Sequence, residues 1–271
     1  MPELNSKKQI ARSARGEITP EFLKQYLQYE DQDLLRLLND GDPRVRTAVA
    51  GILGQRRTMD AIPDLCHRLS KEKALYVKIA ISDALSRIGI VAIPELSRYI
   101  GRIGANQYQS LPEDIFKKWD YPLPRDLVIR SIIRMGAPAL DMLNQYLFKI
   151  NDKAVLSEII DAIGYISFYS KDRSSFENLM TTLAKNADHA LIVWKVIRAL
   201  QAFPSERTLQ VLERFLLDSD VPQHRWEAAR SLGQIATKEA AEYLEMAKKD
   251  QQDQVREMVE SALGYIQDKE K

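Results

Sequence analysis

The chain has 271 residues, of which 45% are hydrophobic and 28% are charged, with 39 basic and 38 acidic side chains. This apolar fraction is enough for a sizeable buried core, and the near-neutral charge argues against nonspecific binding to nucleic acid or to an anionic membrane. The single cysteine, Cys66, excludes an intramolecular disulfide and a cysteine-based zinc site of the usual kind, and no apolar run is long enough to cross a membrane. We therefore expect a cytoplasmic protein without a membrane segment.

The first residues differ from the rest of the chain. Residues 1–16 are polar, with four basic residues and one acidic residue, and we expect a frayed arm that is either solvated or in contact with nucleic acid or an acidic partner. Thr19 and Pro20 then predict the start of a helix that runs to about Tyr29, with Thr19 as the N-cap and Pro20 at the first helical position. From residue 17 to residue 271 we expect a single repeat domain, capped by this helix.

The rest of the chain repeats one helical pattern. Its most regular copy runs from Asp42 to Gly54, and we call the first apolar position of each copy its register position. The seven register positions, spaced by 32, 50, 28, 37, 32 and 31 residues, are Val45, Val77, Leu127, Val155, Ile192, His224 and Val255. The residue eight positions further on is apolar in all seven copies, and the residue four positions further on is apolar in six. Apolar residues at i, i+4 and i+8 predict an amphipathic helix in every copy.

A further apolar helix is predicted between neighbouring register helices. The predicted ranges are 61–69, 92–100, 137–148, 175–184, 208–217 and 239–247. Pro63, Pro94 and Pro138 lie near the starts of the first three, where first-turn N–H groups have no intrahelical partner. Glycine follows the last apolar position of five copies, which suits a helix end or a close helix crossing. Since neither helix of a pair can bury its apolar stripe alone, neighbouring pairs must stack into a continuous core.

The pattern Asp-x-x-Val-Arg-x-x-Ala with a terminal Leu-Gly resembles HEAT repeats, in particular the short kind found in phycobilisome-lyase-like proteins, over residues 31–266. The resemblance implies an all-α fold: a right-handed α–α superhelix of the armadillo type with about seven helix pairs, whose second helices line the concave face. It also implies hydrogen-bonded ladders between successive repeats. The candidate ladder pairs are Asp42 with Arg46, Asp220 with Arg225, and Asp253 with Arg256. The motif indicates a fold and hardly any function.

The spacing of 50 residues marks an insertion at residues 101–124. This segment has two glycines, three prolines and no helical period. Aromatic residues make up 8% of the whole chain, and this one segment holds four of them: Tyr108, Phe116, Trp119 and Tyr121. Aromatic side chains on a long loop either hold the loop against the repeats or contact a partner, and the sequence leaves both alternatives open.

The sequence assembles no catalytic or metal-binding pattern. It lacks a glycine-rich phosphate loop, a nucleophile elbow and a His-Glu-x-x-His site. HEAT-like hydroxylases of deoxyhypusine hold di-iron with repeated His-Glu pairs, and no His-Glu dipeptide occurs here. We interpret His224 as a packed imidazole, because it occupies a register position, and Cys66 as an inert, half-buried thiol. We therefore expect no enzyme activity, no catalytic residue, no metal and no cofactor.

A HEAT-like DNA glycosylase is the main alternative. In such a protein a basic concave groove holds DNA, and Trp194 and Trp226 would face the lesion. Acidic residues on the same predicted helices dilute a basic groove, and a pI near 7.7 is low for a DNA-binding domain. A nucleic-acid partner is therefore disfavoured but kept as an alternative. A lyase-like chaperone or cofactor-attachment subunit rests on the family resemblance alone.

The sequence thus favours a non-enzymatic scaffold that binds a protein partner. Its expected contact surfaces are the concave face and the insertion. The candidate contact residues are Tyr108, Phe116, Trp119 and Tyr121 on the insertion, with Arg130, Arg134 and Lys195 on the inner face.

Overall fold

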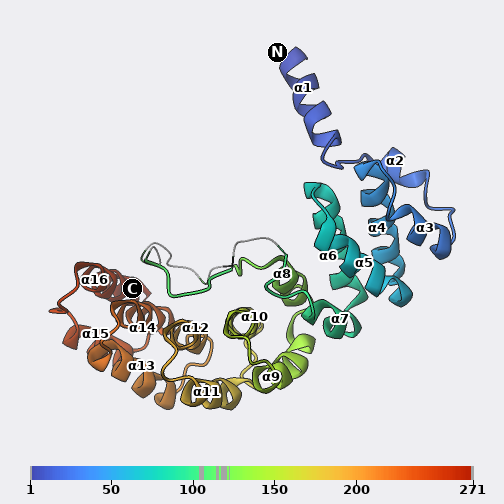
Figure 1. The fold of residues 1–271 in the computed structure, drawn as a ribbon. Helices are drawn as coiled ribbons and strands as arrows, with labels where there is room; N and C mark the ends of the chain where they lie inside the picture. The colour runs from blue at the N-terminus through green and yellow to red at the C-terminus, as the bar shows by residue number, and fades with distance from the viewer. Residues whose placement is uncertain (1, 104–106, 114–115, 117–120, 122, 270–271) are drawn as a thin grey trace. The chain divides into compact units, whose positions relative to one another are not determined.

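The computed structural model describes residues 2–103, 107–113, 116, 121 and 123–269, and the regular elements of these residues are helices (Figure 1). Contacts between the helices divide the chain into two compact units. The N-terminal unit comprises residues 1–105 and 126–139, and the C-terminal unit comprises residues 106–125 and 140–271. The insertion therefore belongs largely to the C-terminal unit, although the chain enters and leaves it from the N-terminal unit. The organisation expected from the sequence, one repeat domain after a polar arm, stays a prediction.

In the N-terminal unit the register helices form one row, in which α6 contacts both α4 and α8. These helices are α4 (Pro43–Arg56), α6 (Leu75–Ile88) and α8 (Leu127–Ile133). A second row contacts the first from one side and holds α3 (Asp31–Leu37), α5 (Ile62–Lys71) and α7 (Ile93–Ser97). The apolar side chains at the register positions and four and eight residues beyond them point between the rows, where Val45, Val49 and Leu53 of α4 are buried.

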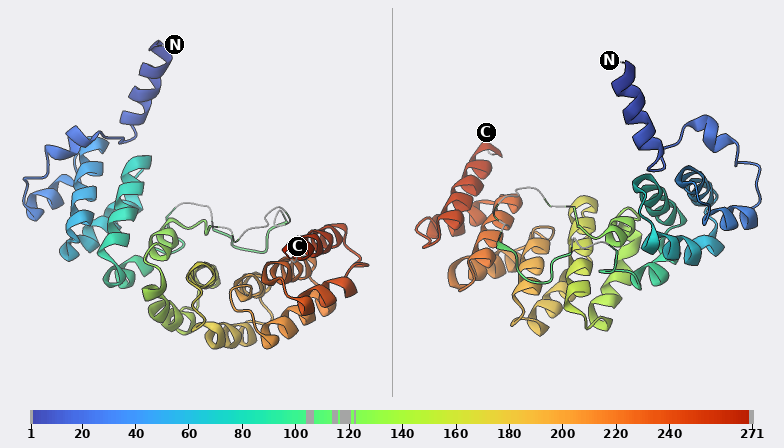
Figure 2. Two further views of the ribbon diagram at one scale, coloured as in Figure 1. Left: turned by 180° about the vertical axis from the view of Figure 1, so that it is seen from behind. Right: turned by 45° about the horizontal axis from the view of Figure 1, so that its top comes forward.

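The C-terminal unit repeats this two-row arrangement (Figure 2). Its register helices, in contact one after the next, are α10 (Lys153–Ser170), α12 (Ala190–Leu200), α14 (Pro222–Ile235) and α16 (Asp253–Lys269). The other row holds α9 (Leu140–Lys149), α11 (Phe176–Lys185), α13 (Glu206–Asp218) and α15 (Lys238–Met246). In the described part of the chain every one of the seven register positions lies on or next to the first turn of a helix, so the predicted all-α solenoid of about seven helix pairs is confirmed.

Two of the predicted intervening helices begin one residue later than the sequence pattern indicates, at Ile62 and Ile93, and a third begins three residues later, at Leu140. Each is preceded by a 3-10 turn, at Met59–Ala61, Ile90–Ala92 and Ala137–Ala139. Pro63 and Pro94 occupy the first turn of α5 and α7, as expected, whereas Pro138 lies inside the 3-10 turn before α9. Ala61 and Ala92 end their 3-10 turns and are fully buried, whereas Ala137 begins its turn and is only partly buried.

The N-terminal arm is helical where the structure describes it. Helix α1 spans Pro2–Ser13 and projects from the rest of its unit in Figure 1. The chain after it is tied to α6, because the Arg15 carbonyl accepts a hydrogen bond of 3.1 Å from the Tyr76 backbone N–H. Thr19 caps α2 (Pro20–Lys24) by accepting from the Phe22 N–H at 3.3 Å, which confirms the predicted start. The α-helix ends at Lys24, earlier than expected, and turns continue the chain to Tyr29.

The motif arginine makes the same contact in three repeats. Its Nη1 donates to the carbonyl of the residue six positions earlier: Arg46 to Asp40 at 2.7 Å, Arg225 to Ser219 at 2.9 Å and Arg256 to Asp250 at 2.6 Å. The guanidinium thereby fixes the turn that leads into its own helix.

The expected ladder pairs are wrong for two of these arginines. Arg46 binds Glu72, with Nε 2.9 Å from a carboxylate oxygen, and Arg225 binds Asp250 at 2.7 Å. Each acid lies in the turn before the next register helix, so the ion pairs do join successive repeats. Asp42 instead accepts from the Arg44 backbone N–H and caps α4. The third candidate pair, Asp253 with Arg256, does form, but within α16 and not between successive repeats.

Close crossing of α4 and α6 depends on Gly54. A Cβ at this position would lie 2.5 Å from Ala84 Cα, which is a backbone atom. Replacing Gly54 with alanine is therefore expected to lower the free energy of unfolding by about 1–3 kcal/mol, because the two helices must move apart. Gly51 of the same helix is the matched control: a Cβ there meets nothing within 4 Å. Gly51→Ala should raise stability by up to about 1 kcal/mol through helix propensity. Urea denaturation of the two variants measures the difference, and shifts of the same sign would contradict the expectation.

Candidate functional site

The C-terminal unit carries a buried set of charged side chains on the face of α10, α12 and α14 that contacts the insertion; we call this face the inner face. These residues come from two positions of the repeat, three and six residues after the register position. They are Glu158 and Asp161 on α10, Lys195 and Arg198 on α12, and Glu227 and Arg230 on α14. All six are at least nine-tenths buried, with exposed fractions between 0% and 7%. Such burial is rare for charged residues unless they are paired.

Glu227 is the centre of this set. Its carboxylate accepts hydrogen bonds from Trp194 Nε1 at 2.8 Å, Arg198 Nη2 at 3.3 Å and Arg230 Nε at 2.7 Å. Three donors from two helices thus meet one carboxylate. Lys195 forms the neighbouring ion pair with Asp161 of α10. The charges of α10, α12 and α14 are therefore linked from helix to helix by pairs of opposite sign.

These contacts stabilise the ionised forms of Glu227 and Arg198 although both side chains are buried. Burial works to raise the pKa of the Glu227 carboxyl, but the nearby Arg230 and Arg198 guanidinium groups outweigh it and hold the pKa below its ordinary value. For Arg198, burial works to lower the pKa, and Glu227 and Asp161 together raise it above its ordinary value. The Arg198 guanidinium also lies over the Trp194 ring, 3.9 Å from its centroid.

The described parts of the insertion run alongside the helices of the inner face (Figure 1), and their aromatic side chains contact α10, α12 and α14. Tyr108 makes an edge contact with Trp194 of α12, with ring centroids 5.6 Å apart, and Phe116 makes one with Trp226 of α14 at 5.8 Å. Tyr108 also lies 5.2 Å from Lys195 Nζ. Three of the predicted site residues, two from the insertion and one from α12, thus lie within this one site.

Tyr121 is the most buried of the insertion's described aromatics, at 3% exposure. Its ring contacts Tyr165 and Phe168 of α10 at 5.9 Å and 5.7 Å between centroids. Burial, followed by the charge of Asp161, raises the pKa of the Tyr121 hydroxyl well above its ordinary value. Tyr121 and Lys195 are thus packed inside the C-terminal unit, while Tyr108 and Phe116 are only partly buried. Trp119, the fourth aromatic candidate, lies outside the described residues.

The two predicted arginines belong to the N-terminal unit. Arg130 lies on α8 and is partly buried, and Arg134 follows the same helix and is exposed. Arg134 Nη1 donates to Ser82 Oγ of α6 at 3.2 Å. The structure therefore assigns the six described candidate contact residues to two different units.

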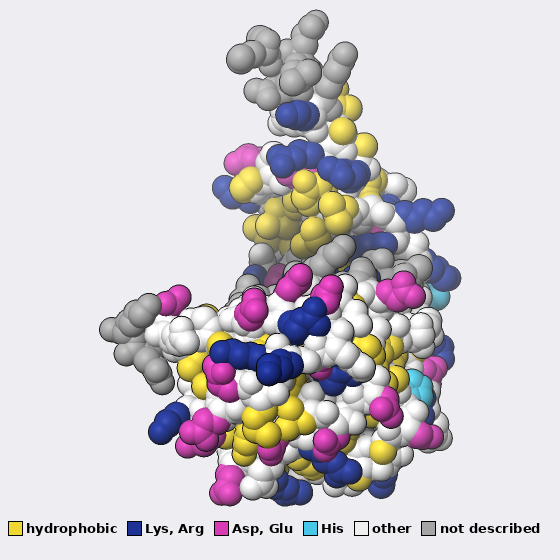
Figure 3. All heavy atoms as spheres, turned by 90° about the vertical axis from the view of Figure 1, so that its left-hand side faces the viewer, with side chains coloured by type: hydrophobic (Ala, Val, Ile, Leu, Met, Phe, Trp, Pro, Cys, Tyr) yellow, Lys and Arg dark blue, Asp and Glu magenta, His cyan; other side chains and the backbone are white. Residues whose placement is uncertain are grey.

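The corresponding position of α6 in the N-terminal unit is exposed. Two residues after the register position, α12 and α14 carry Trp194 and Trp226, which are 1% and 2% exposed. At this position α6 carries Ile79, which is 46% exposed, as is Leu75 one turn earlier. A space-filling view shows hydrophobic side chains gathered on this unit (Figure 3). The same repeat position is thus buried on α12 and α14 and exposed on α6, whereas Ile129 of α8 occupies it as a fully buried residue.

Two residues considered as alternatives for chemistry are structural. His224 Nε2 lies 2.8 Å from the Ala190 carbonyl oxygen, and burial lowers its pKa, so the predicted packed imidazole is confirmed. Cys66 is more buried than the expected half, at 1% exposure, and burial raises the pKa of its thiol to about 12. A thiol with this pKa is a poor nucleophile at neutral pH.

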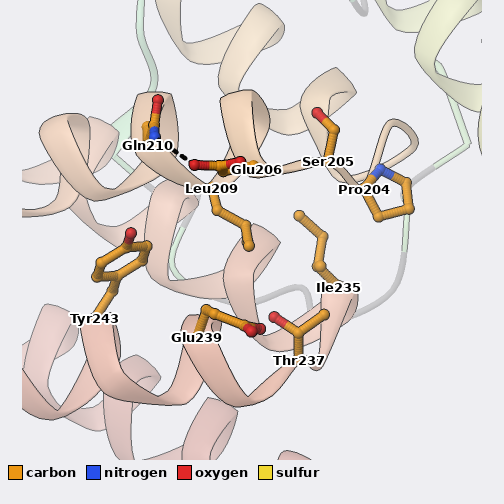
Figure 4. A pocket seen from close by; sticks show the side chains of 9 residues that line it. All are labelled: Pro204, Ser205, Glu206, Leu209, Gln210, Ile235, Thr237, Glu239 and Tyr243. Atoms are coloured by element: carbon orange, nitrogen blue, oxygen red, sulfur yellow. Dashed lines mark hydrogen bonds between the residues drawn. The ribbon is translucent and has the colours of Figure 1, made fainter.

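The C-terminal unit has a pocket between α13 and α15. It has a volume of about 470 Å³, and Glu206, Glu239 and Tyr243 line it together with apolar side chains such as Leu209 (Figure 4). Gln210 Nε2 donates to Glu206 Oε1 at 3.2 Å, so one of its carboxylates already has a partner. In the described ranges no three His, Cys, Asp or Glu side chains are arranged to hold a metal ion.

No helix among the described residues combines the length and the apolar character that crossing a membrane requires.

Sequence reasoning singled out Lys195 but treated its charged neighbours only as a dilution of basic charge. A periodic pattern in the sequence could have identified these charged residues. Positions three and six after the register position read Glu-Asp, Lys-Arg and Glu-Arg in three consecutive copies. At the first of these positions the sign of the charge alternates between stacked helices, which predicts pairing between those helices.

Comparisons with known proteins agree with the repeat pattern. A family model described as HEAT repeats matches residues 25–100 and 177–264, more than half of the chain. No curated protein matches the sequence. Among solved structures, human deoxyhypusine hydroxylase in complex with glycerol is 16% identical with a TM-score of 0.38, over 98% of this chain and 98% of that one. An engineered protein is 18% identical with a TM-score of 0.38, over 89% and 98%. A designed armadillo repeat protein is 16% identical with a TM-score of 0.38, over 88% and 100%.

Proposed function

We propose that this chain, which belongs to the HEAT-repeat family, is a non-enzymatic scaffold that binds a protein partner. The observation that carries the proposal is the open face of α6. Ile79 is 46% exposed at the repeat position where Trp194 and Trp226 are buried, and Leu75, one turn earlier, is exposed to the same extent. Exposed apolar side chains on one helix face, with polar groups around them, are typical of protein interaction surfaces.

Polar side chains border this face and supply the rim of the proposed surface. Asp83 and Arg87 form an exposed ion pair at 2.6 Å one and two turns beyond Ile79. Arg134 lies next to Ser82 on the same unit, and it keeps its proposed role as a partner contact, together with Arg130. A hydrophobic centre with a charged rim is typical of a surface that binds another protein whose contact surface also has an apolar centre and a polar rim.

A nucleic-acid partner is supported less well by the charges. Lys195, Arg198 and Arg230 are the cations of the inner face in the C-terminal unit, and each is paired with a carboxylate. A phosphate backbone attracts a protein mainly by the number of cations that it can neutralise. Paired and buried cations contribute little to that attraction.

The proposal predicts that a partner protein is lost when the α6 face is made acidic. We expect a stoichiometric protein to copurify with the tagged chain from its own cells, with or without nuclease, as identified by mass spectrometry. The double variant Leu75→Asp/Ile79→Asp should reduce its recovery at least tenfold, because an aspartate on each position prevents burial of the face.

The matched control changes two other exposed apolar residues of the same unit. Met59 and Val91 are 63% and 52% exposed and lie in the 3-10 turns before α5 and α7. Met59→Asp/Val91→Asp should leave recovery unchanged. Equal loss of the partner protein from both double variants would argue against the α6 face as the contact surface. If the partner were recovered only without nuclease, the proposal of a protein partner would give way to that of a nucleic-acid partner.

A further inference from the structure

The described aromatics of the insertion engage three consecutive inner helices, one helix each. Tyr121 lies on Tyr165 of α10, Tyr108 on Trp194 of α12 and Phe116 on Trp226 of α14. Edge-to-face contacts of this kind favour specific ring placement and not just burial. The insertion therefore occupies the inner face in the way that a bound segment of another chain would.

Helix α10 leaves room for one of these rings. A Cβ at Gly164 would lie 2.0 Å from Tyr121 Oη, so no residue with a side chain fits there while Tyr121 is in place. Gly164 also faces α12, where a Cβ would lie 2.8 Å from Ala199 Cβ. The floor of the inner face thus includes a seat shaped for an aromatic side chain.

Some buried polar atoms of the described residues around this seat lack hydrogen bonds while the insertion occupies it. Tyr121 is nearly fully buried, yet among the described residues its Oη has no hydrogen-bond partner. Asp161 Oδ1 and Arg198 Nε, on the helices that frame the seat, also lack a hydrogen-bond partner there, although Asp161 Oδ1 lies 3.7 Å from Arg198 Nη1. A buried hydroxyl without a hydrogen bond disfavours the bound state. The insertion therefore fills the shape of the seat without matching its donors and acceptors.

We infer that the inner face of α10, α12 and α14 is a groove for an extended protein segment that bears aromatic side chains, and that the insertion is its built-in occupant, displaced when such a segment binds. The inference deepens the proposed function by adding a second partner surface and the class of its ligand, and it rests on that function. A protein segment is favoured over nucleic acid because the groove offers aromatic rings and paired charges. The bound Tyr108, Phe116 and Tyr121 show the side chains that it accepts.

The experiment uses the insertion itself as the probe. A fluorescein-labelled peptide of residues 106–124 (NQYQSLPEDIFKKWDYPLP) is titrated with the full chain, and its anisotropy is followed. In the wild type the tethered insertion competes at high effective concentration, so the peptide should bind weakly. In the variant Tyr108→Ala/Phe116→Ala/Tyr121→Ala the insertion loses its anchors, and the peptide should bind at least tenfold more tightly.

Two controls separate groove binding from a general effect. Phe148→Ala removes an exposed aromatic from α9, on the opposite row, and should bind the peptide as the wild type does. A peptide with alanine in place of its two tyrosines and its phenylalanine should not bind the triple variant. Peptide affinity that is equal in the wild type and the triple variant, or absent from both, would overturn the inference. Tight, salt-sensitive binding of a single-stranded oligodeoxythymidine in place of the peptide would overturn the protein class.

A conservative variant keeps the test valid if the triple variant fails to fold, as checked by circular dichroism. Tyr121→Phe retains the ring and removes the unpartnered hydroxyl, so the insertion should hold its seat more firmly. Peptide affinity should then fall at least twofold below that of the wild type, and an increase would contradict the inference. Because the probe is a segment of this chain, these results are independent of whether a cellular partner is recovered through α6.

Discussion

Replacing Glu227 with glutamine is expected to lower the free energy of unfolding by about 3–5 kcal/mol. The carboxylate is fully buried and accepts hydrogen bonds from Trp194, Arg198 and Arg230. Glutamine has nearly the same volume but no charge, so the two guanidinium groups would stay buried without their shared anion. Urea denaturation followed by circular dichroism measures the change.

An exposed ion pair of the same unit is the matched control for this variant. Glu177 and Arg207 pair at 2.6 Å, but their side chains are 69% and 55% exposed. Glu177→Gln should cost less than about 1 kcal/mol, because water already solvates both charges. Adding Arg230→Met to Glu227→Gln should recover part of the loss, since it removes one of the stranded cations. If Glu227→Gln and Glu177→Gln lowered the free energy of unfolding equally, burial would not be the reason that the Glu227 network contributes to stability.

Stability of the N-terminal unit is expected to fall by about 3 kcal/mol as the pH is lowered from about 4.5 to about 2, on account of Glu72 alone. Burial works to raise the pKa of this carboxyl, but hydrogen bonds from Arg46, the Ala74 N–H and Arg68 outweigh it and lower the pKa from 4.5 to about 2. The folded state therefore binds fewer protons than the unfolded state in this range. The contribution of Glu72 is complete above the unfolded pKa and is lost as the pH falls through the folded one.

The difference between the wild type and Glu72→Gln isolates this contribution from other carboxyl groups. Urea midpoints measured between pH 6 and pH 2 should differ most at pH 6 and converge near pH 2. Asp33→Asn is the control, because Asp33 forms an exposed ion pair with Arg36 and contributes little to stability. A difference between wild type and Glu72→Gln that is constant with pH would rule out the pKa shift as its cause.

The comparison of the ladder arginines explains where sequence reasoning failed. The motif identifies Arg46 and Arg225 correctly as ladder residues, because both stand at a fixed place in a helical repeat. Their acidic partners, Glu72 and Asp250, lie 26 and 25 residues further along the chain, in turns that the motif does not describe. The nearer acids that the motif contains, such as Asp42, cap their own helices instead. A side chain on a first turn finds backbone N–H groups close by, and the cap therefore forms locally.

The sequence by itself determined the repeat, its seven register helices and the place of the insertion. Those features follow from local periodicity: an apolar side chain at i, i+4 and i+8 specifies a helix and its buried face whatever lies beyond it. The sequence indicates that Gly54 and Gly164 mark either helix ends or close helix crossings. The tertiary structure shows that both are crossings, because Ala84 and Ala199 of the neighbouring helices lie against them.

Only the tertiary structure decided that the inner face of the C-terminal unit is covered while α6 is exposed at Ile79. Ile79 and Trp194 occupy the same position of the repeat, yet one is exposed and the other is buried. The difference arises because the insertion returns to α10, α12 and α14 and places Tyr121, Tyr108 and Phe116 there. Contacts between a loop and helices that follow it by dozens of residues depend on three-dimensional packing, which no local pattern of side chains encodes.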